Sequence, residues 1–226
     1  YYFHIVGEDN AGNIGEEPAV FTVKIDLVAE PPKIISTTHV NPDKYYSNIS
    51  PVFAVEKIND MSGVDGYYYM IDRNPDTMPD KKNSRYVQDG TIKVPDKLED
   101  GEWYFHVITK DRSGNTGTEA THLKFMIEIT PPEVSITELP EFINTEKFDV
   151  SWEAQDKESG VACFDVEFRE GEKGKWKPWL NDTKDRQAKF SGSDGITYFF
   201  RVRAKDNAGN WSQFMEPEKA RVTVDV

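Results

Sequence analysis

The chain contains almost no cysteine, which excludes an internal disulfide. Cys163 is the single cysteine among 226 residues. Many secreted eukaryotic domains depend on disulfides, so their absence favours a prokaryotic source or a core large enough to fold without them. No histidine lies near Cys163 in the sequence to activate its thiol. We therefore interpret Cys163 as a small apolar residue of the core.

Long apolar runs are also missing. No stretch approaches the roughly 20 consecutive apolar residues of a membrane-spanning helix, and no signal peptide is visible. Thirteen prolines and fifteen glycines punctuate the chain and leave no room for long helices. Hydrophobic residues make up 37% and aromatic residues 12%, which is typical of a folded β protein rather than a disordered chain. We expect an all-β segment without membrane insertion.

Positive charge is in deficit. The chain has 27 Lys and Arg against 40 Asp and Glu, for a formal net charge of −13. Such a surface repels nucleic acids and anionic membranes, so we expect no nucleic-acid partner. An acidic exterior keeps a crowded surface protein soluble, and it can also gather cations.

The phrase Asp-x-x-Gly-Asn occurs three times, beginning at Asp9, Asp111 and Asp206. The copies are separated by about one hundred residues, a period that suits one small β-sandwich per repeat. Apolar residues alternate along the nine residues that end at each Asp, as in a half-buried strand. The phrase itself tolerates positive φ and can bond its own backbone, so we predict a hairpin turn.

Two further phrases divide the chain into units. Ser-Gly-Val begins at Ser62 and Ser159, and a tandem proline occurs at 31–32 and 131–132. Tandem prolines form short, fairly stiff joints. We therefore expect complete units at 30–129 and 130–226.

Residues 1–29 should be the last two strands of a preceding unit. An isolated hairpin is marginal in water, so Tyr1, Phe3 and Ile5 need further strands. We expect these strands upstream in a longer protein; the alternative is completion by another chain.

The strand Tyr198–Asp206, together with Trp152 on an early strand, resembles a bacterial or archaeal fibronectin type III domain. The resemblance covers 130–226 well. It covers 30–129 more loosely, where Trp103 takes the place of Tyr198 and Val55 that of Trp152. The resemblance implies tandem immunoglobulin-like, fibronectin type III-like β-sandwiches of seven strands, with Trp152 and Tyr198 in the core. It implies no enzyme activity.

Catalytic constellations are lacking as well. No Ser-His-Asp order, zinc-ligand spacing or phosphate loop appears among the four histidines and their neighbours. His4 and His106 share one repeat column with Arg201, on the face that we expect to point outward. Strand structure explains such a column better than a site does. We predict that the chain is not an enzyme.

Calcium is the one ion that the sequence suggests. The loops holding Ser-Gly-Val and Asp-x-x-Gly-Asn should meet at the pole where the linker enters each unit. This would gather carboxylates, which suit Ca²⁺; the candidates are Asp60, Asp111, Asp156, Glu158 and Asp206. The alternative is that these residues only cap turns by accepting backbone N–H groups. No other cofactor is expected.

Two other kinds of site are open to sequence reasoning. Trp176 and Trp179 lie in a polar segment and could stack on sugar rings, although packing against the sheet is the alternative. Asn48 and Asn181 match the N-x-[ST] glycosylation pattern in polar segments that we expect to be loops.

These features predict a non-catalytic structural or adhesive segment of a prokaryotic cell-surface protein, such as a surface layer, stalk, adhesin or filament. Its partners would be neighbouring immunoglobulin-like domains or identical subunits, and surface glycans. The alternative is an accessory spacer or carbohydrate-binding region of a large secreted hydrolase.

Overall fold

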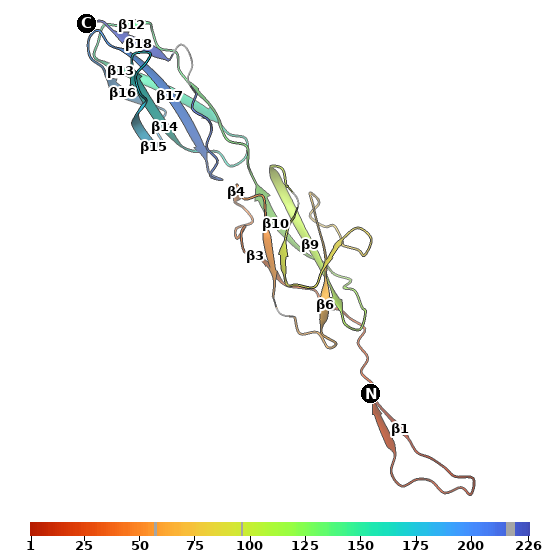
Figure 1. Cartoon of the computed structure of the whole chain (residues 1–226). Helices are drawn as coiled ribbons and strands as arrows, with labels where there is room; N and C mark the ends of the chain where they lie inside the picture. Colours follow the sequence, from red (N-terminus) through yellow and green to blue (C-terminus); the bar gives the residue numbers. More distant parts are fainter. Residues whose placement is uncertain (57, 96, 216–219) are drawn as a thin grey trace.

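The computed structural model describes residues 1–56, 58–95, 97–215 and 220–226. These residues form strands and connecting segments without a helix, so none of them builds a helix that could cross a membrane. A hairpin and two β-sandwiches follow one another along an elongated chain (Figure 1).

The N-terminal hairpin pairs β1 (Tyr2–Ile5) with β2 (Ala19–Thr22) in antiparallel register. The other described residues leave its apolar side chains exposed to solvent: Phe3 is 57% and Ile5 48% exposed. Completion of this hairpin by further strands stays a prediction.

The middle sandwich has a three-stranded and a five-stranded sheet. The smaller sheet has the order β3 (Ile34–Ser36), β5 (Val52–Val55), β8 (Thr91–Lys93). The larger has the order β4 (Tyr45–Tyr46), β10 (Thr121–Ile127), β9 (Gly101–Asp111), β6 (Val64–Asp72), β7 (Arg85–Val87). Only the β4–β10 pair is parallel among the described pairs of this sandwich.

The C-terminal sandwich repeats this topology. Its smaller sheet is β11 (Glu133–Ile136), β13 (Lys147–Gln155), β16 (Gln187–Ser191). Its larger sheet is β12 (Phe142–Ile143), β18 (Arg221–Val224), β17 (Thr197–Asp206), β14 (Val161–Glu170), β15 (Lys177–Thr183). Beside the seven strands implied by the resemblance, β12 adds a short parallel partner to β18. Strands β3–β10 fall within the predicted unit 30–129 and β11–β18 within 130–226; the boundaries themselves stay predictions.

Each sandwich encloses its own core between its two sheets. In the C-terminal one, residues of β17 alternate between partly and fully buried, as the sequence predicts. Trp152 is 0% and Tyr198 5% exposed, so both lie in the core as the resemblance implies. The buried Cys163 is a free thiol, and burial raises its pKa.

The assignment of Val55 as the counterpart of Trp152 was wrong. Thr37 donates its backbone N–H to the carbonyl of Val52, and the equivalent bond runs from Thr137 to Ser151. Val52 and Ser151 therefore occupy equivalent positions, and so do the residues that follow them. Phe53 is thus the counterpart of Trp152. Phe53 is likewise 0% exposed.

The alternating pattern of its strand predicted that His106 points outward into solvent, but the side chain of His106 is buried. Residues Phe105–Thr109 of β9 are all buried, because neighbouring side chains cover the outer face of the sheet as well. Nε2 of His106 lies 3.2 Å from a carboxylate oxygen of Asp72, and its Nδ1 lies 2.7 Å from Nδ1 of His122. The ring of Tyr104 stacks against it.

Acidification should therefore destabilise the middle sandwich. Burial lowers the pKa of both His39 and His106 below the ordinary value of about 6.5. The folded state then binds fewer protons than the unfolded state, so stability is complete above about pH 6.5 and falls as the pH drops towards the folded pKa. Scanning calorimetry between about pH 7.5 and 5.5 should show a falling transition temperature for this sandwich.

The C-terminal sandwich is the internal control for this prediction, since the four histidines of the chain all precede it. Its transition should move less over the same pH interval, and His106→Gln should reduce the shift of the middle sandwich. Equal shifts in both transitions would contradict the assignment to histidine.

Candidate metal centres at the joints

The three Asp-x-x-Gly-Asn phrases form the predicted hairpin turn. In each copy the Asp N–H donates to the Asn carbonyl, at 3.0 Å for Asp9, 3.1 Å for Asp111 and 3.1 Å for Asp206. The turn glycines have φ of 89°, 95° and 108°, a region that residues with a Cβ rarely adopt. Each Asp carboxylate also accepts from the backbone and the side-chain amide of the Asn that ends the phrase. Asp9, Asp111 and Asp206 therefore each cap the turn that they begin.

In the second and third copies the terminal Asn also bonds the preceding unit. Nδ2 of Asn115 donates to the backbone carbonyl of Asp26 at 3.0 Å, and Nδ2 of Asn210 donates to that of Glu128 at 2.8 Å. Asp26 and Glu128 lie just past the last strands of the units before, β2 and β10. Each turn therefore ties a sandwich to the tail of its predecessor.

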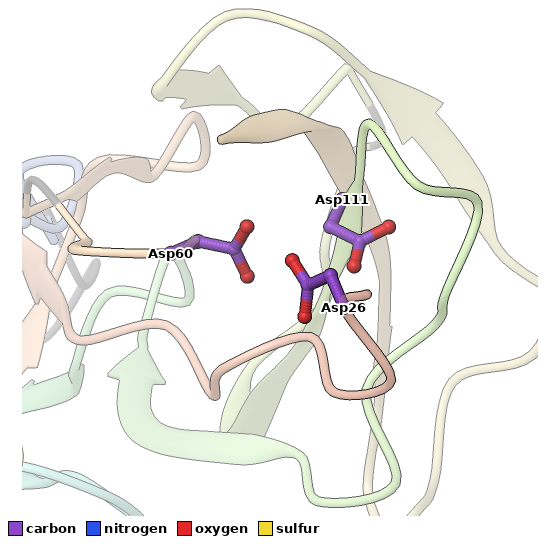
Figure 2. A group of neighbouring side chains, drawn as sticks. All are labelled: Asp26, Asp60 and Asp111. Atoms are coloured by element: carbon purple, nitrogen blue, oxygen red, sulfur yellow. The ribbon is translucent and has the colours of Figure 1, made fainter. Parts of the chain in front are cut away.

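Three carboxylates meet at the first joint (Figure 2). Asp26 comes from the tail of the hairpin, Asp60 from the loop before β6, and Asp111 from the end of β9. One ligand atom of each lies within 4.8 Å of those of the others. We call this group the first triad.

The same arrangement recurs at the second joint. Glu128 from the tail of the middle sandwich joins Asp156 of the loop before β14 and Asp206 at the end of β17, again within 4.8 Å of one another. We call this group the second triad. Each triad thus combines one carboxylate from the preceding unit with two from the unit that follows.

The Ser-Gly-Val phrase orients two carboxylates of each triad. The Ser62 N–H donates to Asp26 at 2.9 Å and to Asp60 at 3.0 Å. At the second joint, the Ser159 N–H donates to Oε1 of Glu128 at 3.3 Å, while the next residue, Gly160, donates to Asp156 at 2.5 Å. Backbone amides therefore set the direction of these side chains.

The carboxylate that the preceding unit contributes is more deeply buried in the second triad than in the first. Glu128 is only 1% exposed, and its Oε2 has no hydrogen-bond partner among the described residues. Burial raises the pKa of Glu128, and the charges of Asp156 and Asp206 act in the same direction. Asp26 is more exposed, and hydrogen bonds from Ser62 lower its pKa. One oxygen of Asp60 is also buried without a described partner.

Of the carboxylates predicted as calcium ligands, Glu158 lies outside both triads. Its Oε2 accepts a 2.8 Å hydrogen bond from the hydroxyl of Tyr45 in the middle sandwich. Burial, followed by this contact, raises the pKa of Tyr45 to about 12. Glu158 therefore helps to hold the two sandwiches together through a protein contact.

Sequence reasoning missed Asp26 and Glu128. Both stand at the same distance past the Asn of the preceding phrase, from Asn13 to Asp26 and from Asn115 to Glu128. An acidic residue repeated just ahead of each tandem proline is the signal that could have identified them.

The two candidate tryptophans lie in different surroundings. Trp179 packs against the core, with its ring centroid 6.2 Å from that of Trp152 and 5.2 Å from that of Phe190. Trp176 is half-buried between two guanidinium groups, 4.7 Å from that of Arg169 and 4.4 Å from that of Arg201. Glycan binding by this pair stays a prediction.

The two glycosylation candidates are both exposed. Asn48 lies in the segment between β4 and β5, where its Oδ1 accepts the N–H of Ser50 at 2.9 Å. Asn181 lies within strand β15 rather than in a loop, next to Asp182 with its positive φ of 50°. Modification of either residue stays a prediction.

Comparison with known proteins gives structural likeness alone. No family model matches the chain, and no curated protein matches it in sequence. The fibronectin(III)-like modules of Clostridium thermocellum CbhA align over 85% of this chain and 94% of theirs, with 12% identity and a TM-score of 0.41. The FN1-FN3 domains of chicken CNTN1 align over 96% and 76%, with 13% identity and a TM-score of 0.36. By its own strand order and cores, the chain contains two tandem all-β sandwiches with an immunoglobulin-like, fibronectin type III-like fold.

Proposed function

We propose that the chain is a non-catalytic structural segment of a cell-surface protein, in which successive β-sandwiches form a stiff extracellular spacer. The observation that carries this proposal is that the joint is built twice in the same way. At each joint, a turn Asn holds the backbone of the incoming tail and a serine N–H holds its carboxylate. A regular joint gives successive units a regular direction.

Further contacts support stiffness. The Thr121 hydroxyl donates to the carbonyl of Pro32 at the first joint. At the second, Asp100 accepts the N–H of Ile129 and the hydroxyl of Thr130. Relative motion is the default between domains joined by few contacts, so these bonds and the tandem prolines argue for a restrained joint.

The surroundings that we propose are those of a surface layer, stalk, adhesin or filament. The acidic exterior would keep a crowded surface protein soluble. The partners that we propose are adjacent immunoglobulin-like domains or identical subunits. Because each sandwich has its own core, successive sandwiches would extend the chain away from the cell surface without packing onto one another.

Small-angle X-ray scattering tests the spacer proposal. The wild-type chain should give the distance distribution of an elongated particle. Asn115→Ala combined with Asn210→Ala removes one tail-holding bond at each joint, a loss of about 0.5–1.5 kcal/mol per bond, and should broaden the distribution towards shorter distances.

Asn13→Ala is the matched control, because Asn13 ends the same turn but its amide bonds Asp9 within the hairpin. This variant should scatter like the wild type. A wild-type distribution already as broad as that of freely linked domains would refute the stiff spacer.

A further inference from the structure

The second triad contains an unusual unpaired group. Glu128 is almost completely buried beside two other carboxylates, yet Oε2 has no described hydrogen-bond partner. A buried carboxylate oxygen without a partner costs free energy comparable to the loss of a hydrogen bond or more. Capping of the Ser-Gly-Val loop does not explain the unpaired oxygen, because the N–H of Ser159 bonds the other carboxylate oxygen of Glu128, Oε1. A cation would satisfy the oxygen and offset the mutual repulsion of the triad.

The chemistry of the triads selects the cation. All six side chains offer carboxylate oxygen, and neither triad contains histidine or cysteine, the ligands that zinc prefers. Carboxylates from three separate segments, completed by water, suit the flexible coordination of Ca²⁺ at about 2.3–2.6 Å. Mg²⁺ requires more compact octahedral geometry and gives up its water reluctantly.

An ion can also reach the second triad from solvent. An open hollow of about 520 Å³ at the joint is lined in part by Glu128 and Asp156. At the first joint, a larger open hollow of about 800 Å³ is lined by Asp60. Each triad therefore has at least one carboxylate beside a hollow that opens to solvent.

We propose that each triad binds one Ca²⁺, with Asp26 or Glu128 of the preceding unit and two aspartates of the following unit as ligands. The ion bridges two successive units at the point where the tail enters. Calcium then favours the joint geometry seen in the structure over any arrangement that withdraws the tail carboxylate. This proposal does not rest on the spacer function, since the hydrogen bonds of the joint exist without an ion.

Calorimetric titration of the chelator-treated chain with CaCl₂ tests the proposal. The titration should extend to about 5 mM, because extracellular calcium-binding modules have dissociation constants of about 0.1–1 mM. We expect two equivalents of bound Ca²⁺, one for each triad. Glu128→Gln and Asp26→Asn should each remove one equivalent, and the double variant should remove both. These substitutions keep side-chain size and change residues of the tail, outside the repeated turn.

Thermal melting of Glu128→Gln gives a second readout that a merely structural role would not produce. In chelator, this variant should melt no lower than the wild type, because the substitution removes a buried charge from an acidic group. With excess CaCl₂ the order should reverse, since only the intact triad gains stability from binding.

Two controls separate the triads from general acidity. Asp9→Asn changes the equivalent turn of the hairpin, and Glu158→Gln removes the neighbouring carboxylate that bonds Tyr45. Both variants should retain two equivalents. Absence of calcium binding, or two equivalents retained in the double variant of Asp26 and Glu128, would overturn the proposal while leaving the scattering test of the spacer unaffected.

Discussion

Replacement of Trp152 by alanine is expected to destabilise the C-terminal sandwich by about 3–5 kcal/mol. Trp152 is 0% exposed on β13, and its ring makes edge contacts with Phe164 and Trp179 at centroid distances of 6.3 Å and 6.2 Å. Its indole N–H has no described partner. The loss therefore comes from packing and the cavity left behind, without a broken hydrogen bond to add to it.

Denaturant unfolding, followed separately for the two sandwiches, measures this effect. The transition of the middle sandwich should not move, because it has a separate core around Phe53. Trp176→Ala is the matched control within the same unit, since that ring lies between Arg169 and Arg201 rather than in the core. A half-exposed stack of this kind contributes about 0.5–1 kcal/mol per contact. Comparable losses for the two tryptophans would contradict the assignment of Trp152 to the core.

Alternation in the sequence predicted which residues face the core but left the register open. Phe53 and Val55 both stand on the inward face of β5, two residues apart. A shift by two residues keeps every side chain on its face, so the pattern cannot distinguish the two pairings. The hydrogen bonds to β3 fix the register and make Phe53 the counterpart of Trp152. His106 was misplaced because alternation assumes a solvated outer face, whereas β9 is covered on both faces.

The candidate site could be predicted where it depends on loops of a single sandwich. Asp60 and Asp111, like Asp156 and Asp206, follow from the expectation that two loops share one pole. The tail residues Asp26 and Glu128 could not be placed in the same way, because their position depends on how one unit enters the next. Glu158 was assigned to the site through its proximity in sequence to Asp156, but its carboxylate bonds Tyr45 of the other sandwich.

Asp206→Ala should give the second large loss, about 2–4 kcal/mol in the C-terminal sandwich when measured in chelator. The carboxylate of Asp206 is 1% exposed and accepts the N–H groups of Gly209 at 2.6 Å and Asn210 at 2.7 Å, besides the Asn210 amide at 2.7 Å. Alanine leaves these donors without their acceptor in a region that water reaches poorly. It also releases the amide that holds the tail at Glu128.

Asp9→Ala provides the contrast, because it removes the same turn contacts from an exposed hairpin where water can replace them. Its effect on the unfolding of either sandwich should be undetectable. Asp206→Asn should fall between the two in chelator, since an amide oxygen can still accept the backbone N–H groups but carries no charge. With calcium present, Asp206→Asn should lose stability relative to the wild type to a greater extent than in chelator, because it also removes a proposed ligand. If Asp206→Ala lowers the free energy of unfolding as little as Asp9→Ala does, the Asp-x-x-Gly-Asn turn contributes equally to stability in every copy. Burial of the turn at the joint then adds nothing to stability.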